Sequence, residues 1–556
     1  MNDCMKRKHF KTEKLALLII TIIASLLRVI KLDTYPPALY SDEVAQGYNA
    51  YSVLTTGLDE YGTWLPVSFR SFGDWKPPLP TYFMVPTIAV FGLNEYGIRI
   101  SSALFGIGSV LLTYLLTKLL CKDSAVALVA AGILTISPWH IVQSRAAMLV
   151  SGELFFLLLA LLAFFKGLTV KKWWIVSAVS WALVIYSYYA GRLIVPLILL
   201  FLFISFRKQI LAAKTRLAVP VIAAFALLLP LGFALLNQPD VLFGRAKTVS
   251  VFYDQGVALT VWDLIAQDGN EMLPLMAQFF HNKPYHYVID IVRRFFQYFD
   301  GRFLFLTGDK QLPFQIPNMG ILYLVEAPLL LIGIRELVMK HKRIRSLLLF
   351  WIAVSVLPAA LTFVTPASNR TFTMVVPFSI LTALGIMALI NKFNKSSISF
   401  FLVTALSAGY LFSFSNFFYQ YTQVLPKQHA DRWHFGYQEL YRYLKSEEDQ
   451  YKVIAISAKT SVPYIFLLYH YQMPPSEAID AIDRNFVTDE FGFEHVNQVG
   501  KYRFPRHFAW EKDGVKLPAH SLLVLTPEEM AGSSAREKKQ IYYPNGAIAF
   551  RIYEIE

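Results

Sequence analysis

Long apolar runs, separated by short Lys/Arg clusters, are the feature that most limits what this 556-residue chain can fold into. The runs are about 15 to 24 residues long, roughly the length that a helix needs to cross ~30 Å of hydrocarbon. Only 16% of the residues are charged, whereas ordinary soluble domains are about a quarter charged. These features exclude a soluble cytosolic enzyme and predict a polytopic membrane protein.

The first apolar run, Leu15 to Ile30, follows a basic stretch from Lys6 to Lys11. This order resembles a signal peptide, but no small-residue cleavage site follows, so we expect an uncleaved anchor with a cytoplasmic N-terminus. About eleven spans are expected in all. The other ten lie near residues 97–120, 124–142, 150–166, 173–188, 192–206, 217–237, 320–340, 346–364, 372–391 and 396–415.

A further apolar segment, Leu79 to Gly92, is short and contains Pro80 and Pro86. If it crossed the membrane, four later basic clusters would lie opposite the basic N-terminus, against the positive-inside rule. If it lies in the interface as an amphipathic or re-entrant helix, all four clusters fall inside. We therefore predict an interfacial helix. The four clusters are Lys118 and Lys122, Lys171 and Lys172, Arg207 to Arg216, and Arg335 to Arg345.

The formal charge of +13 comes from 52 Lys and Arg against 39 Asp and Glu. Because these cations gather between the spans, we interpret the excess as topogenic and do not expect a nucleic acid partner. Two cysteines, Cys4 and Cys121, are too few for a disulfide framework or a Cys-rich metal site.

The predicted topology leaves three segments outside: residues 31–96, 238–319 and everything after about residue 416. Residues 1–415 would form the transmembrane domain, and 416–556 a soluble extracytoplasmic domain. The latter contains strand-like runs at Lys452 to Ile456, Leu522 to Leu525 and Ile548 to Ile552. The expected fold is therefore an all-α polytopic membrane bundle with a small C-terminal α/β domain.

Charged side chains are frequent at the outer ends of the predicted spans. A charge next to an apolar helix costs free energy, so such residues often have a functional role. One interpretation is a site for a phosphate-bearing lipid, because guanidinium groups pair with phosphate while a neighbouring carboxylate can accept a proton. The alternative is that lipid headgroups merely attract the arginines. We favour the first for the set as a whole, which comprises Asp42, Glu43, Lys76, Arg99, Arg145, Arg192 and Arg370.

Four segments together resemble the N-terminal half of GT-C glycosyltransferases, in particular the dolichyl-phosphate-mannose protein mannosyltransferase family and its bacterial relatives, including aminoarabinose transferases. The resemblance covers roughly the first 200 residues. The segments are Tyr40 to Glu43, Trp75 to Tyr82, Tyr96 to Gly106, and Ser137 to Trp139 leading to Ser144 and Arg145.

Such enzymes move a sugar from a polyprenyl-phosphate carrier to an acceptor at the outer membrane face, usually with inversion. The resemblance implies that Asp42 activates the acceptor hydroxyl, that Glu43 is its neighbour in the same motif, and that Lys76 and Arg99 hold the carrier phosphate. Arg145, Arg192 and Arg370 are added to the phosphate site from their placement alone. Protein mannosyltransferases also insert MIR domains in a later loop, and nothing here has that size or pattern, which puts a protein acceptor in doubt.

The chemistry of such a transfer agrees with this set of residues. A sugar C1 bound to phosphate needs little protonation of its leaving group, so cations for the departing phosphate and one base suffice. We therefore expect a glycosyltransferase that moves a hexosyl or pentosyl group to a lipid, glycan or protein acceptor, among membrane lipids. No metal ligand cluster is evident, although Asp42 and Glu43 could help to hold a divalent cation.

Two other functions fit a polytopic protein with charged outer ends. A transporter or flippase for a polar lipid predicts repeat symmetry and charges at mid-span depth, whereas the charges here crowd one face. An oligosaccharyltransferase or ligase that moves a whole glycan would differ only in its grooves for donor and acceptor.

Overall fold

The chain forms two compact units in a computed structural model that describes residues 2–269, 273–310, 312–393, 397–489, 492–506, 517–529, 531 and 535–555. Unit 1 comprises Met1–Ile30, Ala103–Ser144 and Leu149–Phe418. Unit 2 comprises Lys31–Ser102, Arg145–Met148 and Tyr419–Glu556. The first predicted outer loop, residues 31–96, thus belongs to the same compact unit as residues 419–556. The division into a transmembrane domain and a soluble domain at residue 416 stays a prediction.

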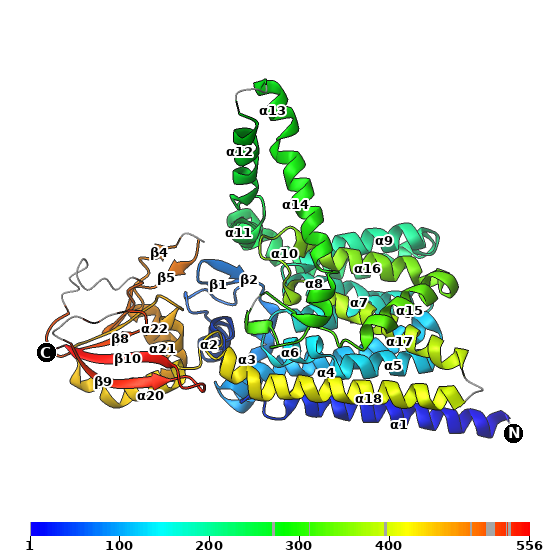
Figure 1. Cartoon of the computed structure of the whole chain (residues 1–556), viewed down its shortest axis with the longest axis horizontal. Helices are drawn as coiled ribbons and strands as arrows, with labels where there is room; N and C mark the ends of the chain where they lie inside the picture. Colours follow the sequence, from blue (N-terminus) through cyan, green and yellow to red (C-terminus); the bar gives the residue numbers. More distant parts are fainter. Residues whose placement is uncertain are drawn as a thin grey trace. The chain divides into compact units, whose positions relative to one another are not determined.

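Unit 1 is a bundle of long helices (Figure 1). Its membrane helices are α1 (Asn2–Val29), α4 (Glu95–Cys121), α5 (Ser124–Ile136), α6 (Pro138–Arg145), α7 (Val150–Gly167), α8 (Trp173–Ser187), α9 (Gly191–Ala212), α10 (Lys214–Asn237), α15 (Glu326–Lys340), α16 (Lys342–Ala360), α17 (Val375–Lys392) and α18 (Ser397–Tyr419). Three of them, α4, α6 and α18, include residues of unit 2 at one end. A 3₁₀ turn, η3 (Ser368–Met374), leads into α17.

Seven helices in the described part of the chain are long and apolar enough to cross a membrane, or eight if α5 and α6, which meet at a bend of 57°, form one span. The remaining three predicted spans are also helical. However, α8 and α15 have 15 residues each, and α1 includes the charged residues Lys11, Glu13, Lys14 and Arg28. Every predicted span therefore coincides with a helix, while the expected number of about eleven exceeds the seven or eight that meet this test of length and hydropathy.

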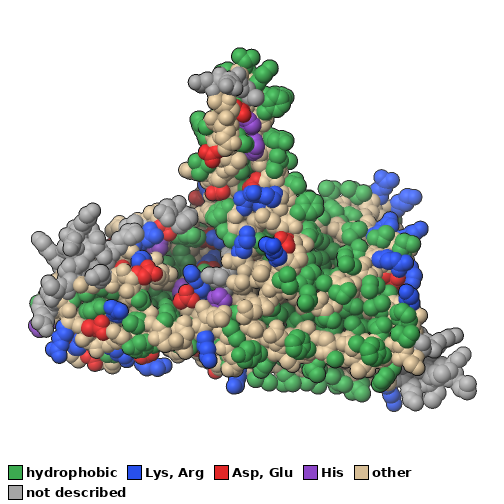
Figure 2. Space-filling view, in the orientation of Figure 1, with side chains coloured by type: hydrophobic (Ala, Val, Ile, Leu, Met, Phe, Trp, Pro, Cys, Tyr) green, Lys and Arg blue, Asp and Glu red, His purple; other side chains and the backbone are tan. Residues whose placement is uncertain are grey.

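Helices at the centre and at the edge of the bundle differ in how much apolar surface they bury. The most apolar stretches of α7 and α17 are 78% buried, whereas those of α10 and α18 are 6% and 0% buried. Figure 2 shows hydrophobic side chains spread over the surface of the helical bundle. In α18, Phe400, Phe401 and Phe412 are exposed. In water such a surface would be unstable, so these helices face lipid.

Two glycines let α15 and α17 approach each other closely. A Cβ on Gly333 would lie 1.8 Å from the carbonyl oxygen of Leu381, and one on Gly385 would lie 2.0 Å from that of Leu329. Small residues at helix crossings in membranes allow such backbone contact, which replaces the hydrophobic driving force that lipid removes.

We expect Gly385→Ala to lower stability by about 1–3 kcal/mol or more, because the added methyl group forces the two helices apart. Thermal unfolding of the detergent-solubilised protein measures this. Gly132→Ala in α5 is the matched control, since a Cβ there meets nothing within 4 Å. Equal melting temperatures for the two variants would show that the crossing adapts without cost.

Two of the basic clusters that were predicted to lie inside meet at one end of unit 1. Lys122, at the end of α4, and the residues Lys340, Lys342 and Arg343, between α15 and α16, surround a hollow of about 330 Å³ with Cys121. Like charges repel one another, so their clustering needs an explanation. The positive-inside rule provides one, because Lys and Arg are enriched in the loops on the cytoplasmic side. This clustering supports the predicted orientation, which stays a prediction.

A reporter fused after Glu556 is expected to signal from the external side of the membrane, because an odd number of spans follows a cytoplasmic N-terminus. A phosphatase and a fluorescent-protein fusion at this position give opposite readouts. A cytoplasmic signal would overturn the odd span count and the interfacial assignment of Leu79 to Gly92.

The second predicted outer loop is helical rather than irregular. It contains α11 (Asp240–Val249), α12 (Gly256–Asp268), α13 (Pro274–Phe280) and α14 (Lys283–Gln297). Helices α12 and α14 pack together and project from the rest of unit 1 (Figure 1). A π-helical turn, η1 (Arg302–Leu306), and a 3₁₀ turn, η2 (Leu312–Phe314), follow before α15.

Unit 2 contains a six-stranded sheet in the order β6-β7-β3-β8-β10-β9, in which β3 lies parallel to β7 and β8 and the other pairs are antiparallel. The three predicted strands correspond to β3, β8 and β10, which confirms the small α/β region. The strands are β3 (Val453–Ile456), β4 (Val487–Thr488), β5 (Glu494–His495), β6 (Gln498–Val499), β7 (Tyr502–Arg503), β8 (Ser521–Leu525), β9 (Ala535–Tyr542) and β10 (Ile548–Ile555).

Unit 2 also contains helices, of which the first two along the chain belong to the first predicted outer loop and the others to the C-terminal part. They are α2 (Ser41–Thr56), α3 (Leu79–Phe91), α19 (Leu425–Gln428), α20 (Tyr437–Glu447), α21 (Pro463–Tyr471) and α22 (Pro475–Ala481), with a π-helical turn η4 (Gln420–Val424) and a 3₁₀ turn η5 (Glu448–Gln450). Val44 and Tyr48 of α2 share one hydrophobic core with Phe466 of α21 and Ile454 of β3. The Tyr48 hydroxyl donates to the carbonyl of Met473 at 2.9 Å. This shared core is why the loop and the C-terminal part form one unit.

The predicted interfacial segment is α3, a 13-residue helix that contains Pro86. It buries Met84 and Ile88 and exposes Val90 and Phe91. A short apolar helix with one buried and one exposed face is suited to the membrane interface, and the interfacial assignment stays a prediction.

Candidate functional site

The accessible carboxylate of the predicted site, Asp42, lies in the first turn of α2. Its Oδ1 accepts a hydrogen bond from the Lys76 Nζ at 2.6 Å. The two partners differ in exposure, because the Asp42 side chain is 41% exposed and the Lys76 side chain only 6%. The partial positive charge at a helix N-terminus further favours the ionised carboxylate. The pair therefore presents one carboxylate to solvent, backed by a buried cation.

A tight hairpin places Lys76 opposite Asp42. Strands β1 (Phe69–Ser71) and β2 (Asp74–Lys76) pair antiparallel, and the two linking residues, Phe72 and Gly73, have φ of +55° and +79°. Positive φ at both positions is typical of the type I′ turn that matches strand twist. Within this hairpin the Lys76 Nζ also donates to the Ser71 Oγ at 3.2 Å and lies 4.8 Å from the centre of the Phe72 ring.

Arg99 and Glu43 form a buried ion pair directly behind Asp42. Both side chains are 0% exposed. The guanidinium donates twice to the Glu43 carboxylate, at 3.0 and 3.1 Å, and also to the backbone carbonyls of Leu32, Pro36 and Ala38. These five contacts match the five N–H donors of an arginine. No donor of Arg99 is left for a phosphate in this arrangement, although the sequence predicted such a contact.

Glu43 joins three segments of unit 2. Besides Arg99, its carboxylate accepts the backbone N–H of Tyr40 at 3.0 Å and that of Ala147 at 2.8 Å. The carboxylate is therefore fully engaged, and Glu43 anchors the start of α2. A bound cation would have to displace these donors, so the pair Asp42 and Glu43 does not fit the divalent cation considered above. Among the described residues no group of three or more His, Cys, Asp or Glu side chains could hold a metal.

Arg145 also contacts backbone carbonyls. Its guanidinium donates to Lys31 at 2.8 Å and to Tyr35 at 3.0 and 3.2 Å. It lies 5.9 Å from the centre of the Tyr421 ring and is 4% exposed. Arg145 and Arg99 thus both fix the loop that leads into α2.

Arg192 and Arg370 belong to unit 1, at the start of α9 and in η3. Arg192 donates to the carbonyls of Val241 and Leu242 at 3.0 and 3.1 Å. Arg370 donates to the Thr362 Oγ1 and, at 3.1 Å, to the carbonyl of Val364. Of the seven predicted site residues, unit 2 thus brings together Asp42, Glu43, Lys76, Arg99 and Arg145.

Sequence reasoning missed a buried acid in the same unit. Glu60 is fully buried; its Oε1 accepts from the Tyr464 hydroxyl at 3.4 Å and its Oε2 has no partner among the described residues. Burial raises the pKa of Glu60 to about 7, although nearby Arg484 opposes the shift. No local signal in the sequence distinguishes Glu60 from a solvated loop residue.

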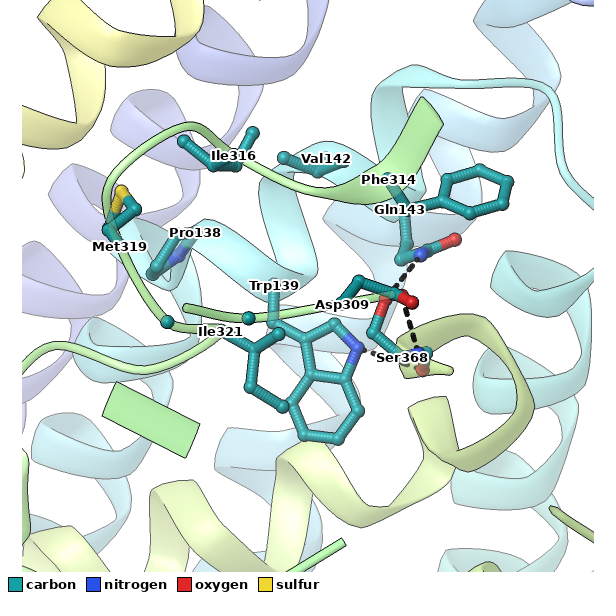
Figure 3. A pocket seen from close by; sticks show the side chains of 12 residues that line it. Pro138, Trp139, Val142, Gln143, Asp309, Phe314, Ile316, Met319, Ile321 and Ser368 are labelled. Carbon is teal, nitrogen blue, oxygen red and sulfur yellow. Dashed lines mark hydrogen bonds between the residues drawn. The ribbon is translucent and has the colours of Figure 1, made fainter. Parts of the chain in front are cut away.

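A small cavity in unit 1 lies beside the turn that carries Arg370 (Figure 3). Ser368 is bonded on three sides: its N–H donates to the Asp309 Oδ2 at 2.6 Å, its Oγ accepts from the Gln143 Nε2 at 3.2 Å, and its carbonyl accepts from the Trp139 Nε1 at 3.0 Å. The cavity of about 10 Å³ has room for one water. These contacts fix the backbone before Arg370 rather than form a sugar pocket.

Comparison with known proteins gives matches in sequence and in fold. The sequence model of the family described as "Dolichyl-phosphate-mannose-protein mannosyltransferase" matches residues 18–250. YkcB of Bacillus subtilis, provisionally named a mannosyltransferase, is 28% identical over 203 residues, which cover 35% of this chain and 28% of that protein. The match thus spans less than a third of that relative.

The fold match extends over nearly the whole chain. The crystal structure of ArnT from Cupriavidus metallidurans in the apo state superposes with a TM-score of 0.57 at 11% identity, over 96% of this chain and 97% of that one. The structure of the same protein bound to undecaprenyl phosphate gives a TM-score of 0.55 at 11% identity over the same shares of the two chains. This chain therefore has the GT-C glycosyltransferase fold, and its N-terminal part resembles the dolichyl-phosphate-mannose protein mannosyltransferases and their bacterial relatives.

Proposed function

We propose that this protein is an integral membrane glycosyltransferase that moves a sugar from a polyprenyl-phosphate carrier to an acceptor hydroxyl or amine at the outer membrane face, with inversion. The observation that carries the proposal is the pair of Asp42 and Lys76, which places one exposed carboxylate 2.6 Å from a buried ammonium group. A base and a cation side by side are what a substitution at a sugar phosphate needs.

In the proposed reaction, Asp42 accepts the proton of the acceptor hydroxyl. The acceptor oxygen attacks the sugar C1, the bond from C1 to the phosphate oxygen breaks, and the carrier leaves as polyprenyl phosphate. Lys76 neutralises the negative charge that grows on the departing phosphate. The proton on Asp42 returns to solvent after the product leaves, which restores the base for the next cycle.

Lys76 can contribute to the phosphate site while it holds Asp42. An ammonium group has three N–H donors, and the described acceptors of Lys76 are the Asp42 Oδ1 and the Ser71 Oγ. One donor is thus left for a donor phosphate. We propose that Arg99 and Glu43 instead position the loop and the first turn of α2, and that Arg145, Arg192 and Arg370 are secondary candidates for phosphate contacts.

The comparisons support the class of donor. The matching family is named for a dolichyl-phosphate-mannose donor, and ArnT, which has the same fold, was solved with undecaprenyl phosphate. Both carriers are polyprenyl phosphates. The sugar and the acceptor are not specified by these matches; lipid, glycan and protein acceptors are all compatible with the site.

The proposal is tested with the purified protein in liposomes that contain radiolabelled polyprenyl-phosphate sugars and a membrane extract as acceptor. We expect release of polyprenyl phosphate together with a labelled product, and no transfer when the matching nucleotide sugar replaces the lipid donor. Transfer from the nucleotide sugar alone would overturn the donor class. Movement of the intact lipid donor between leaflets, without cleavage, would instead support the transporter.

Mass spectrometry of cell-envelope glycans from a strain that lacks the gene identifies the acceptor. We expect one glycan, glycolipid or glycoprotein to lose the mass of a single sugar, because each reaction transfers one residue. Loss of a whole oligosaccharide would point to the ligase.

A further inference from the structure

An aromatic ring lies against the Lys76 ammonium group and belongs to Phe72, in the turn of the β1–β2 hairpin. The Lys76 Nζ lies over the face of this ring, 4.8 Å from its centre, and both side chains are buried. A ring face attracts a cation through its quadrupole, and the attraction is stronger where water is excluded. Phe72 is therefore a further neighbour of the ammonium group, besides the Asp42 Oδ1 and the Ser71 Oγ.

The backbone of Phe72 has an unfavourable conformation. Its φ is +55°, in a region that a residue with a bulky side chain rarely adopts. Such a conformation persists where the surrounding contacts enforce it. Besides the hairpin itself, these contacts come from the C-terminal part of unit 2.

Glu494 of β5 contacts the hairpin in two ways. Its N–H donates to the carbonyl of Phe72 at 3.1 Å, and its Oε1 accepts from the Arg70 Nη2 at 2.5 Å. The turn and β5 also pack closely, because a Cβ on Gly73 would lie 3.0 Å from the Glu494 Cγ. Arg70 and Glu494 are 424 positions apart in the chain, so the C-terminal part holds the hairpin only when unit 2 is folded.

A second residue of the C-terminal part packs on the Phe72 ring itself. Tyr464 of α21 meets this ring edge to face, with ring centres 6.1 Å apart and an interplanar angle of 80°, an arrangement that aromatic pairs prefer. The Tyr464 ring is buried, and its hydroxyl donates to the Glu60 carboxylate, which fixes its orientation. Phe72 thus contacts both the C-terminal part and the cation of the proposed site.

We propose that Phe72 is a positioning residue for the phosphate contact: its ring holds the Lys76 ammonium group beside Asp42, and Glu494 and Tyr464 hold Phe72. The C-terminal part of unit 2 thereby contributes to the reaction through the hairpin. This proposal rests on the proposed function, in which Lys76 binds the donor phosphate. Its first half concerns phosphate binding and its second half the hold on the hairpin, and a separate experiment tests each.

The alternative is that Phe72 only fills space. It belongs to the hydrophobic core that α2, α21 and β3 share. Loss of a ring that only fills space would lower the stability of the protein, but it would leave the affinity of the folded protein for a phosphate unchanged. The two roles therefore differ in what they predict for binding.

The first experiment measures the dissociation constant of undecaprenyl phosphate for the purified full-length protein in detergent. Phe72→Leu keeps an apolar side chain but removes the ring face, and it should raise this constant about 3- to 10-fold. Phe72→Tyr keeps the ring face and should bind like the wild type. The matched control is Phe504→Leu, because Phe504 is a buried ring of the same core; it should lower the melting temperature without a change in affinity.

The second experiment measures hydrogen exchange of the backbone amides of residues 69–76 and needs no substrate. Glu494→Ala removes the ion pair with Arg70 and should speed this exchange at least ~3-fold. Its matched control is Glu528→Ala, which removes an ion pair with Lys459 elsewhere in unit 2 and should leave the exchange unchanged. Glu494→Ala should also weaken the binding of undecaprenyl phosphate, in the same direction as Phe72→Leu.

Two results would overturn the proposal. If Phe72→Leu binds undecaprenyl phosphate like the wild type while Lys76→Ala binds it more weakly, Phe72 does not position Lys76. If Glu494→Ala and Glu528→Ala exchange equally at residues 69–76, the C-terminal part does not hold the hairpin. Unchanged binding in Lys76→Ala is a different failure: it removes the phosphate contact of the proposed function and the role of Phe72 in it, whereas the exchange comparison still decides what holds the hairpin.

Discussion

Replacing Asp42 by Asn should lower the turnover number by roughly 10² to 10⁴, the usual contribution of a positioned general base. Asn keeps the size of the side chain and its hydrogen bond from Lys76, but it cannot take the proton of the acceptor. Because the phosphate contacts are unchanged, the affinity for the lipid donor should change little. The measurement is transfer from a purified polyprenyl-phosphate sugar in liposomes, with donor binding assayed separately.

A control for this experiment comes from the buried neighbour. Glu43→Gln removes a charge from the same helical turn, but Glu43 is 0% exposed and cannot reach an acceptor. It should therefore reduce the thermal stability more than the turnover number of the folded fraction. If Asp42→Asn turns over at the wild-type rate, Asp42 is not the base; if only donor binding is lost, Asp42 positions the donor.

Arg99→Ala should destabilise the protein by about 3–5 kcal/mol, because it leaves the buried Glu43 carboxylate without its cation. The substitution also leaves the carbonyls of Leu32, Pro36 and Ala38 without their donor. We expect a lower melting temperature in detergent and faster proteolysis of the loop before α2. Arg99→Lys should be intermediate, because an ammonium group keeps the charge but offers three donors in place of five.

The double variant Arg99→Met with Glu43→Gln tests whether the effect comes from the pair. Removing both charges should recover part of the stability that Arg99→Ala loses, because no uncompensated carboxylate remains. If Arg99→Ala is as stable as the wild type and only its donor affinity falls, Arg99 contacts the donor phosphate, as the sequence first predicted.

Features that depend on short stretches of sequence could be predicted. Hydrophobic length predicted the helices of the bundle, because a helix satisfies its own backbone in lipid and needs no distant partner. Short strand-like apolar runs likewise predicted β3, β8 and β10. The segment Tyr40 to Glu43 predicted an acidic site in the first outer loop. The resemblance of this and three further segments to a known family predicted the fold, which the structural comparison confirmed.

The roles of the charged residues depended on which partners the fold brings together. Arg99 and Glu43 are 56 residues apart, and Glu43 and the N–H of Ala147 are 104 apart, so no local pattern could pair them. The sequence placed each arginine at the outer end of a span, but burial determines whether its guanidinium meets a backbone carbonyl or a ligand. The same limit applies to Glu60, whose burial depends on the distant Tyr464.

What the sequence determined by itself is the kind of protein, a helical membrane bundle with an α/β region and an acidic motif at the start of one loop, because hydrophobic length and local motifs are short-range properties. Only the tertiary structure decided that Asp42 is the exposed member of its motif, that Arg99 is enclosed, and that the first loop shares a core with the C-terminal sheet. Exposure and electrostatic pairing arise from long-range packing, which brings into contact residues that the chain itself keeps far apart.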